Sequence, residues 1–301
     1  QFWRNKGVKR HRILALDGGY HGETLGAMSA GARSIFSAHF QDYLFEVEHL
    51  PFPSDKESCL RALKEELKNG DVVAFIFEPL VQGAGGMRMY SPEVLDQLIK
   101  ACQDRGVLCI ADEVMTGFGR TGTYFACNQL KEKPDFMCLS KGLSGGTMPL
   151  SITTCTQEIF DAFLGDDITT AFLHGHSFTG NPVGCASAIA SLDLLEKEEC
   201  QTSIKRIAQR HLEFAEEIVG NTILENVRMM GTILALEIKT ENVGYASEIK
   251  DILYKHFISE GVLLRPLGNV IYVLPPYCIT DQELKKVYKS IISGLDKIAN
   301  R

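Results

Sequence analysis

Residues 72–112 begin with the apolar run VVAFIFEP (72–79), continue through SPEVLDQLIKACQDRG (91–106) and end with VLCIAD (107–112). The first and last runs are short and continuously apolar, which favours buried strands. The middle run repeats apolar residues on one helical face, at positions 94, 95, 98, 99 and 102. Two buried strands joined by an amphipathic helix are typical of a βαβ unit, and therefore of a parallel sheet.

The start of this helix is also marked in the sequence. Pro92 suits the first helical position, where a backbone N–H group is not needed. Ser91 precedes it, and we expect its side chain to accept a hydrogen bond from a free N–H group of the first turn. Gly106 is expected to end the helix.

Strands and helices alternate over much of the chain. Further strands are predicted at 13–19, 135–140 and 150–155, and a second helix opens at Asn181-Pro182. The sequence therefore predicts an α/β fold, in which a mostly parallel sheet is flanked by helices. We assign this large domain to residues 1–199.

Residues 200–301 predict a smaller C-terminal α+β domain. Its expected elements are a charged helix over 203–218, a strand pair around Gly231, a helix over 245–259, short strands over 262–265 and 270–274, and a last helix. Thr280 and Glu283 form the pattern of a capping box at the start of that last helix.

Composition excludes several classes of protein. The chain has 301 residues, 45% of them apolar and 23% charged, with a net charge of −7, as in ordinary globular proteins. Because it has no Lys/Arg run, we expect neither nucleic acid nor a membrane surface as partner. The nine cysteines never form a C-x-x-C pair, so we expect no metal site. We expect the cysteines to be reduced core residues, and the protein to lie in the cytoplasm.

Three predicted strands end at residues capable of chemistry. Asp112 closes VLCIAD, Lys141 follows a strand at 135–140, and Tyr20 follows ILALDGG. Ligands of open α/β sheets bind beyond the carboxyl ends of the strands, so we expect the three residues to face one crevice. A desolvated lysine is a competent nucleophile for carbonyl compounds. Pyridoxal phosphate needs such an amine, and a carboxylate against its pyridine nitrogen.

These residues also have plainer explanations. A lysine before a glycine is usually a solvated loop residue. Asp112 and Glu113 can bind Mg²⁺ or act as the paired carboxylates of a hydrolase, although adjacent strand residues point to opposite faces. His174 and His176 suggest a metal only weakly, because no third ligand is evident.

Longer motifs narrow the choice. They are GGYHGETLGAMS (18–29), FEPLVQGAGGM (77–87), ADEVMTGFGRTG (111–122), LSKGL (139–143) and HGHSFTGNPVGCASA (174–188). In sequence and in order, these motifs resemble the class III pyridoxal-phosphate aminotransferases of fold type I, over nearly the whole chain. The resemblance implies pyridoxal 5'-phosphate as cofactor, transamination as the reaction, and a homodimer with shared active sites.

The same resemblance implies roles for single residues. Lys141 forms the Schiff base with the cofactor, Asp112 pairs with its pyridine nitrogen, and Tyr20 stacks on its ring. His21 and Gly22 complete the turn that carries Tyr20 and also contact the cofactor.

Other roles involve the partner subunit and the substrates. In this family a hydroxyl residue reaches the cofactor phosphate of the neighbouring subunit, and here that residue is Ser177. The segment VLLRPLGNVIYVLPPY (262–277) resembles one whose arginine binds a substrate carboxylate, which nominates Arg265. Tyr272 and Gly175 are nominated for the same pocket. Arg265 can equally be a surface salt-bridge residue, and Tyr272 a packed strand aromatic.

Within the class, the sequence most resembles the aminotransferases of biotin synthesis. That branch implies S-adenosylmethionine as amino donor and 8-amino-7-oxononanoate as acceptor. Other class III activities, on ornithine, acetylornithine, GABA or diamines, are the nearest alternatives. A non-catalytic fragment that retains the dimer surface is a further one.

Members of this class carry a further N-terminal portion before the motif at residue 18. It includes a turn whose N–H groups bind the cofactor phosphate within the same subunit. We therefore expect the large domain to be N-terminally incomplete, and the 301-residue chain alone to bind the cofactor weakly.

Overall fold

The computed structural model describes residues 1–35, 37–240 and 248–299, and the chain divides into two compact units. Unit 1 comprises Gln1–Gly85, Tyr90–Phe118 and Phe125–Asp193. Unit 2 comprises Gly86–Met89, Gly119–Tyr124 and Leu194–Arg301. A domain boundary at residue 199 stays a prediction.

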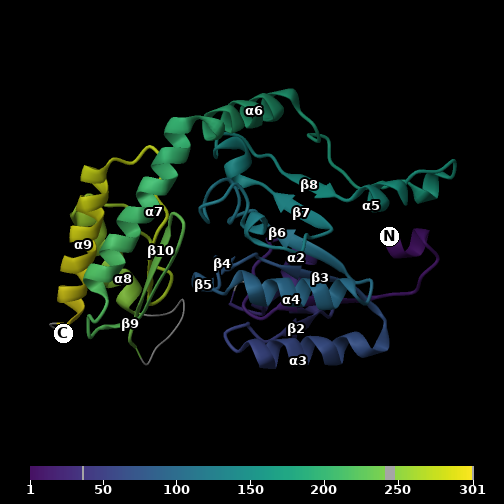
Figure 1. Ribbon diagram of the computed structural model, residues 1–301, viewed down its shortest axis with the longest axis horizontal. Helices are drawn as coiled ribbons and strands as arrows, with labels where there is room; N and C mark the ends of the chain where they lie inside the picture. Colours follow the sequence, from purple (N-terminus) through teal and green to yellow (C-terminus); the bar gives the residue numbers. More distant parts are fainter. Residues whose placement is uncertain (36, 241–247, 300–301) are drawn as a thin grey trace. The chain divides into compact units, whose positions relative to one another are not determined.

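A six-stranded sheet forms the centre of unit 1 (Figure 1). Its order is β2-β1-β3-β6-β7-β8, and all neighbours are parallel except β7 and β8. The strands are β1 (Arg12–Leu16), β2 (Glu48–Leu50), β3 (Val72–Phe77), β6 (Leu108–Asp112), β7 (Phe136–Leu139) and β8 (Ile152–Cys155). The predicted mostly parallel sheet is confirmed, and the antiparallel edge strand β8 is the exception.

The other elements that lie in unit 1, or begin there, are mostly helical. They are α1 (Phe2–Asn5), α2 (Leu25–Ala30), η1 (Ala38–Tyr43), α3 (Lys56–Glu66), η2 (Leu67–Asn69), β4 (Val81–Gln82), α4 (Pro92–Gln103), η3 (Ala126–Gln129), η4 (Lys141–Ser144), α5 (Gln157–Asp161), η5 (Ile168–Thr170) and α6 (Pro182–Glu196). Helix α4 packs against α3 and β6, α3 also contacts β2, and α2 contacts β1.

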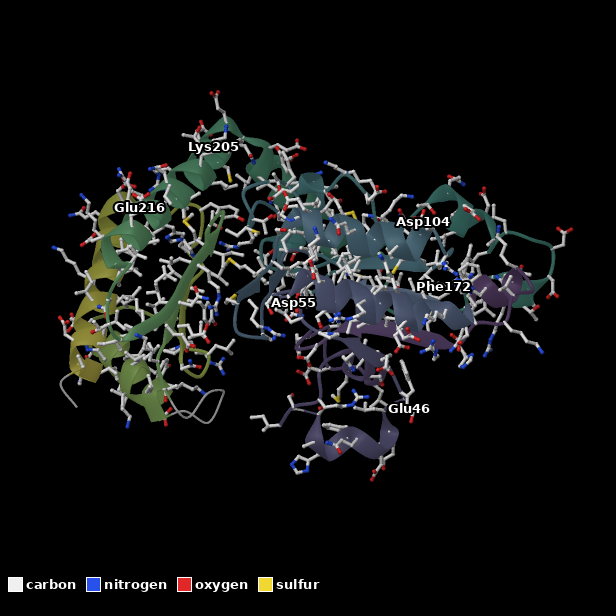
Figure 2. All side chains as sticks on the ribbon, turned by 60° about the horizontal axis from the view of Figure 1, so that its bottom comes forward. Glu46, Asp55, Asp104, Phe172, Lys205 and Glu216 are labelled. Carbon is white, nitrogen blue, oxygen red and sulfur yellow. The ribbon has the colours of Figure 1, made fainter. Side chains whose placement is uncertain are left out.

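Helix α4 confirms its predicted start and apolar face, but not its predicted cap. It begins at Pro92, and its buried residues are those at the five positions of the predicted apolar face. The predicted cap by Ser91 is wrong, because its side chain makes no hydrogen bond to the helix N–H groups. It pairs instead with Glu93, and this hydrogen bond lowers the pKa of the Glu93 carboxyl. Helix α3, by contrast, is capped by Asp55 (Figure 2), which accepts from the N–H groups of Glu57 and Ser58.

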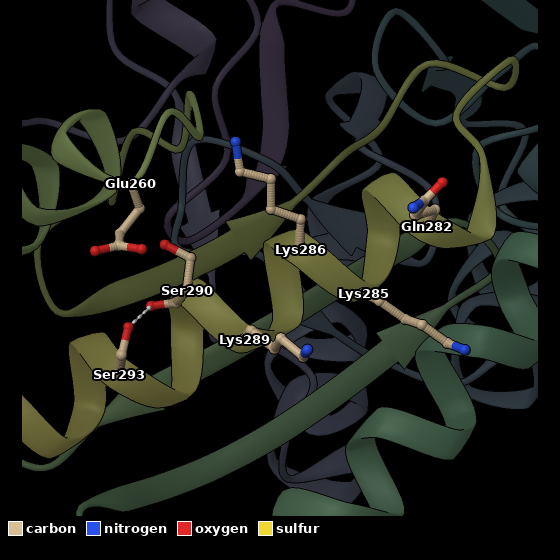
Figure 3. Close-up of a pocket in the computed structure, with 7 residues that line it drawn as sticks. All are labelled: Glu260, Gln282, Lys285, Lys286, Lys289, Ser290 and Ser293. Atoms are coloured by element: carbon tan, nitrogen blue, oxygen red, sulfur yellow. Dashed lines mark hydrogen bonds between the residues drawn. The ribbon is translucent and has the colours of Figure 1, made fainter.

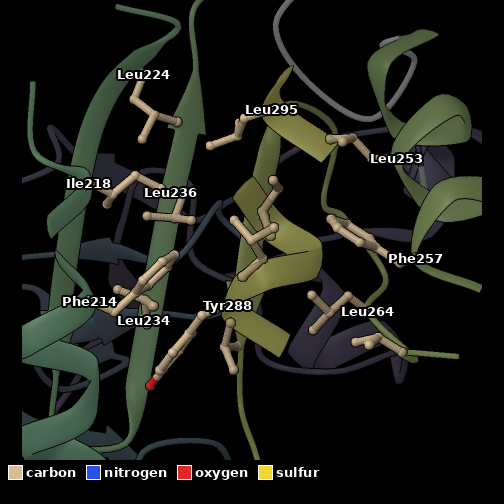
Figure 4. Close-up of a cluster of buried hydrophobic side chains, with 14 of the residues drawn as sticks. Phe214, Ile218, Leu224, Leu234, Leu236, Leu253, Phe257, Leu264, Tyr288 and Leu295 are labelled. Carbon is tan, nitrogen blue, oxygen red and sulfur yellow. The ribbon is translucent and has the colours of Figure 1, made fainter. Parts of the chain in front are cut away.

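Unit 2 is a three-stranded antiparallel sheet with helices packed on it. Its sheet order is β11-β10-β9, and the helices enclose one buried apolar cluster (Figure 4). Within the cluster the rings of Phe214 and Tyr288 stack at 4.2 Å. The elements are β5 (Arg88–Met89), α7 (Glu198–Ile218), β9 (Leu224–Met230), β10 (Ile233–Ile238), α8 (Glu248–Ser259), β11 (Val270–Val273) and α9 (Asp281–Ala299).

The strand pair around Gly231 and the strand over 270–274 are confirmed, but two predictions for unit 2 need correction. The helix placed over 203–218 begins earlier, at Glu198. The strand over 262–265 is wrong, because the N–H group of Leu264 bonds locally to the carbonyl of Val262 and Pro266 has no N–H group to give to a ladder.

Two further points concern the helices of the chain. The start of the helix expected over 245–259 lies outside the described residues. In the part of the chain that the structure describes, no helix is both long and apolar enough to cross a bilayer.

Candidate active site

The candidate site lies where neighbouring strands of unit 1 end. Strands β1, β3, β6 and β7 are consecutive and parallel, so their carboxyl ends meet at one edge of the sheet. Asp112 is the last residue of β6, Lys141 comes shortly after β7, and Tyr20 shortly after β1. The structure therefore brings these three residues to the same edge.

Asp112 is a buried carboxylate, only 7% exposed. Its Oδ1 accepts from the N–H group of Val114 at 3.1 Å, and its Oδ2 lies 2.8 Å from Nδ1 of His21. Because an ionised carboxylate only accepts, Nδ1 of His21 carries the hydrogen. Asp112 is thus held in one orientation from two sides, as a carboxylate that anchors a cationic group must be.

His21 is itself buried, with 2% of its side chain exposed. Its second ring nitrogen, Nε2, is buried and has no hydrogen-bond partner among the described residues. An orphaned polar atom of this kind is uncommon in a folded protein, and it is typical of a site that takes up a further group or a water molecule.

The turn after β1 presents Tyr20 beside this pair. Gly18 and Gly22 have φ angles of +76° and +124°, which side-chain-bearing residues rarely adopt. Tyr20 is 38% exposed, and its hydroxyl donates to Glu23 at 2.6 Å. The ring therefore has an accessible surface and a fixed hydroxyl, both of which suit stacking on a flat ligand.

A second loop packs closely on this turn. A Cβ atom placed on Gly85 would lie 2.5 Å from the carbonyl oxygen of Gly18. Only a residue without a side chain allows the two backbones to approach so closely. The glycine-rich stretch QGAGG thus supports the turn that carries Tyr20.

Lys141 has an unusual backbone conformation. Its φ angle is +43°, which is uncommon and costly for a residue with a side chain and is found most often at functional sites. The neighbouring Gly142 packs on Phe118, where a Cβ atom would lie 2.8 Å from that ring. The expected desolvation of the amine is not found, because the turn over η4 carries Lys141 beyond the strand end, where it is exposed in this chain.

Helix α6 holds the loop of Lys141 from one side. The hydroxyl of Ser191 donates to the carbonyl of Gly142 at 3.1 Å, and that of Ser187 to the carbonyl of Ser144 at 3.4 Å. The strained turn is therefore fixed by side chains outside the strands.

The remaining predicted residues lie elsewhere. Ser177 and Gly175 are exposed residues of unit 1, in the stretch before α6. Tyr272 is a half-buried residue of β11, and Arg265 is exposed between α8 and β11, both in unit 2. Among the described residues, Arg265 has no ion-pair partner. The roles of these four residues stay predictions.

Two further carboxylates are buried at these strand ends: Glu78, which the sequence analysis gave no role, and Glu113, which it considered only together with Asp112. Glu78 follows β3 and is 5% exposed; burial raises its pKa to about 7, although it accepts hydrogen bonds from Gly83 and Tyr20 N–H groups. Glu113 follows β6, is fully buried, and accepts from the N–H group of Cys127 at 2.8 Å. Its partners differ from those of Asp112, so the two adjacent acids lie in separate hydrogen-bond networks. A carboxylate directly after an apolar strand is the signal that points to Glu78.

A hollow along α9 in unit 2 does not resemble a catalytic site. It is lined by Glu260, Gln282, Lys285, Lys286, Lys289, Ser290 and Ser293 (Figure 3). The three lysine side chains point in different directions instead of converging on one place. We assign it no ligand.

The residues at the strand ends fit pyridoxal phosphate. Asp112 offers a buried, oriented anion for a protonated ring nitrogen, and Tyr20 offers an aromatic face. Lys141, in the turn after the adjacent strand β7, carries an amine. An amine, an anion and an aromatic face are the groups that this cofactor needs.

Comparison with known proteins agrees with this geometry. Residues 1–295 match the family described as aminotransferase class III, and the chain belongs to that family. Its cofactor is pyridoxal phosphate, and its fold is that of the pyridoxal-phosphate-dependent aminotransferases.

Among its relatives, the adenosylmethionine-8-amino-7-oxononanoate aminotransferase of Synechococcus elongatus is 47% identical, over 99% of this chain and 72% of that protein. The enzyme of the same description from Methanocaldococcus jannaschii has a crystal structure that matches with a TM-score of 0.92, at 32% identity, over 98% of this chain and 70% of that one. An amine transaminase from an uncultivated Pseudomonas species, solved with the cofactor bound, matches with a TM-score of 0.91 at 30% identity, over 98% and 72% of the two chains.

Proposed function

We propose that this protein transfers an amino group from S-adenosylmethionine to 8-amino-7-oxononanoate, giving 7,8-diaminononanoate, in biotin synthesis. The observation that carries the proposal is the oriented Asp112, paired with His21 at the strand edge that also carries Lys141. The description shared by relatives from several bacteria, 47% identical in Synechococcus elongatus and 37% in Helicobacter pylori, supports the choice of substrates.

Each of these residues at the strand edge has a task in this reaction. Asp112 keeps a proton on the pyridine nitrogen, and His21 keeps Asp112 in place. Tyr20 holds the ring by stacking, and Lys141 attaches the cofactor through its Nζ atom. When bound, pyridoxal phosphate supplies an electron sink for the negative charge that develops on the donor carbon.

Lys141 also moves the proton. With the donor bound, the Nζ amine of Lys141 would accept the proton from the donor carbon. Donor and acceptor use the same residues in turn, so the kinetics are of the ping-pong type.

In unit 2, the Arg265 guanidinium binds the acceptor carboxylate with two parallel hydrogen bonds, and Tyr272 contacts the acceptor. Gly175, in the stretch before α6, is a separate proposed substrate contact. The exposure of Arg265, and its lack of an ion-pair partner among the described residues, leave it available for this role.

The amino donor decides between this activity and its nearest rivals. The experiment supplies the cofactor-loaded protein separately with S-adenosylmethionine, ornithine, acetylornithine, GABA and a diamine, and measures the deaminated product of each by mass spectrometry. We expect product from S-adenosylmethionine alone. Product from ornithine or GABA, with none from S-adenosylmethionine, would move the protein to another branch of the family.

The protein is also proposed to act as a homodimer with shared sites. Large apolar side chains lie exposed on β8, on α5 and through to α6, among them Phe172 (Figure 2). The others on this stretch are Ile152, Phe160, Leu164, Ile168, Leu173, Phe178, Val183 and Ile189. Apolar surface of this extent is typical of an interface. The stretch includes Ser177, which we propose to bind the cofactor phosphate of the partner subunit.

We place the protein in the cytoplasm. All nine cysteines are free, and several are fully buried in apolar surroundings. Cysteines used as core residues, without disulfides, are typical of a reducing compartment.

A further inference from the structure

Glu78 connects two loops at the centre of the candidate site. It lies directly after β3, the strand between β1 and β6. Its Oε1 accepts from the N–H group of Tyr20 at 3.0 Å, and its Oε2 from the N–H group of Gly83 at 2.8 Å. One carboxylate oxygen therefore serves the turn after β1, and the other serves the loop after β3.

The burial of the Glu78 carboxylate requires an explanation. Burying a charged group is costly, and an isolated loop can be held by a neutral acceptor at lower cost. A carboxylate, however, is the one common side-chain group that presents two strong acceptors and no donor. Both partners of Glu78 are N–H groups, so an amide in its place would direct one NH₂ group against one of them.

The turn held by Glu78 carries two residues of the proposed mechanism. Tyr20 gives its N–H group to Glu78, and the next residue, His21, orients Asp112. A displacement of the backbone at Tyr20 therefore moves both the aromatic ring and the imidazole that holds Asp112.

We propose that Glu78 is a positioning residue for the cofactor site, whose ionised carboxylate clamps the Tyr20 and Gly83 N–H groups and so fixes the stacking ring and the His21–Asp112 pair. The clamp itself is a property of the chain, and its effect on catalysis rests on the proposed function.

The surroundings of Glu78 make this clamp sensitive to pH. Burial raises its pKa to about 7, opposed by the two N–H groups and by His21, and reinforced by Asp112. The hydroxyl of Tyr90 donates to its backbone carbonyl at 2.5 Å and leaves the carboxylate to the two loops. Protonation turns one acceptor oxygen into a donor, so the clamp loosens as the pH falls below the pKa.

The first test uses the full chain without cofactor. Amide proton shifts of Tyr20 and Gly83 are followed by NMR from about pH 5 to about pH 9, a range that spans the titration of such a group. We expect both amides to titrate with one midpoint, and this titration to vanish in E78Q. The matched control is E113Q, which removes the charge of another buried carboxylate without touching the turn, and it should leave the titration intact.

The second test asks whether the clamp serves catalysis. Loss of one charge-assisted hydrogen bond in the site is expected to lower kcat of E78Q about tenfold. KM should change less, and the acidic limb of the kcat profile should be lost. E113Q should keep the shape of the profile. E78D, which keeps the charge but is too short to reach both loops, should recover only part of kcat and serves if E78Q fails to fold.

The outcomes separate the two proposals. Titration of neither amide, or an unchanged titration in E78Q, would overturn the clamp. A lost titration with an unchanged kcat profile would overturn its positioning role. If the clamp is found but the unaltered protein transaminates no donor, the proposed function fails while the clamp stands.

Discussion

Gly85 leaves almost no room for a side chain at the candidate site. An alanine there would place its Cβ atom 2.5 Å from the carbonyl oxygen of Gly18, so one backbone must move. We expect G85A to lower the free energy of unfolding by about 1–3 kcal/mol, as overpacking does. Urea denaturation measures this loss.

The matched control for this change is Gly26, inside helix α2. A Cβ atom on Gly26 meets nothing within 4 Å. We expect G26A to be neutral or slightly stabilising, because alanine favours the helix and restricts the unfolded chain. Equal losses in G85A and G26A would show that the close approach to Gly18 has no special cost.

His211 predicts how unit 2 responds to acid. Its Nε2 lies 3.2 Å from the carbonyl of Thr232, and its Nδ1 accepts from the hydroxyl of Tyr288 at 2.7 Å. This arrangement fits the neutral ring. Burial lowers its pKa from 6.5 to about 4, so at intermediate pH the unfolded chain binds a proton that the folded chain does not.

The free energy of unfolding should therefore fall as the pH decreases from about 6.5 to about 4, with up to about 3 kcal/mol of the loss due to His211. Urea denaturation at several pH values should show a shallower decline for H211Q. The exposed His39 supplies the control, because H39Q should keep the slope of the unaltered chain. Equal slopes for H211Q and the unaltered chain would contradict this account.

The functional residues at the strand ends could be predicted from the sequence more readily than the groups that form hydrogen bonds with them. Asp112 and Lys141 stand out because each follows an apolar run. The role of Glu78 depends on two loop N–H groups that reach it from other segments, and no local pattern records such contacts. The exposure of Lys141 depends on the η4 turn, which is held by side chains of helix α6 and is therefore a tertiary property.

At the scale of elements, the two helix starts at Thr280 and Ser91 differ. Thr280 and Glu283 form a reciprocal capping box, with the Thr280 N–H group donating to Glu283 at 2.8 Å and the Glu283 N–H group to Thr280 at 3.2 Å. Ser91 occupies the same position before α4 without such a bond. We expect T280A to cost about 1 kcal/mol of stability and S91A clearly less, since only the first loses a cap.

Thermal and urea denaturation of the two variants provide the measurement. S91A removes a hydroxyl group, and T280A removes a hydroxyl and a methyl group of an exposed residue, so the main difference between the two variants is the cap. A larger loss in S91A than in T280A would mean that the hydrogen bonds at these two helix starts are misassigned.

Elements with strong periodicity were predicted well, and those that depend on distant partners were not. The apolar face of α4 and the capping box of α9 follow from the local sequence. Segment 262–265 is apolar enough for a strand. The N–H groups of Val262 and Leu264, however, bond to nearby carbonyls, and Pro266 has no N–H group. Strand β2 is too short to leave a pattern, and its existence depends on pairing with β1.

At the scale of the whole molecule, shared sites can be tested by mixing two defective chains. K141A removes the amine, and S177A removes the hydroxyl proposed to serve the partner. In a mixed dimer, one site carries both defects and the other carries neither. Random mixing should therefore restore about a quarter of the unaltered activity, because half of the dimers each regain one of two sites.

The same mixture gives a different result if Ser177 serves its own subunit. Every mixed dimer would then have one site without Lys141 and one without Ser177, and no native site would form. Activity no higher than the average of the separate variants would contradict sharing. Sedimentation of the mixture checks that dimers have formed and exchanged.

The proposed reaction depends on a covalent bond between pyridoxal phosphate and the Lys141 amine, at the sheet edge that also carries Asp112. The most direct measurement is borohydride reduction of the cofactor-loaded protein, followed by mass spectrometry of its peptides. We expect a stable phosphopyridoxyl group on Lys141 and none on Lys133 or another lysine, with the label lost in K141A. A label on a different lysine, or an undiminished label in K141A, would contradict it.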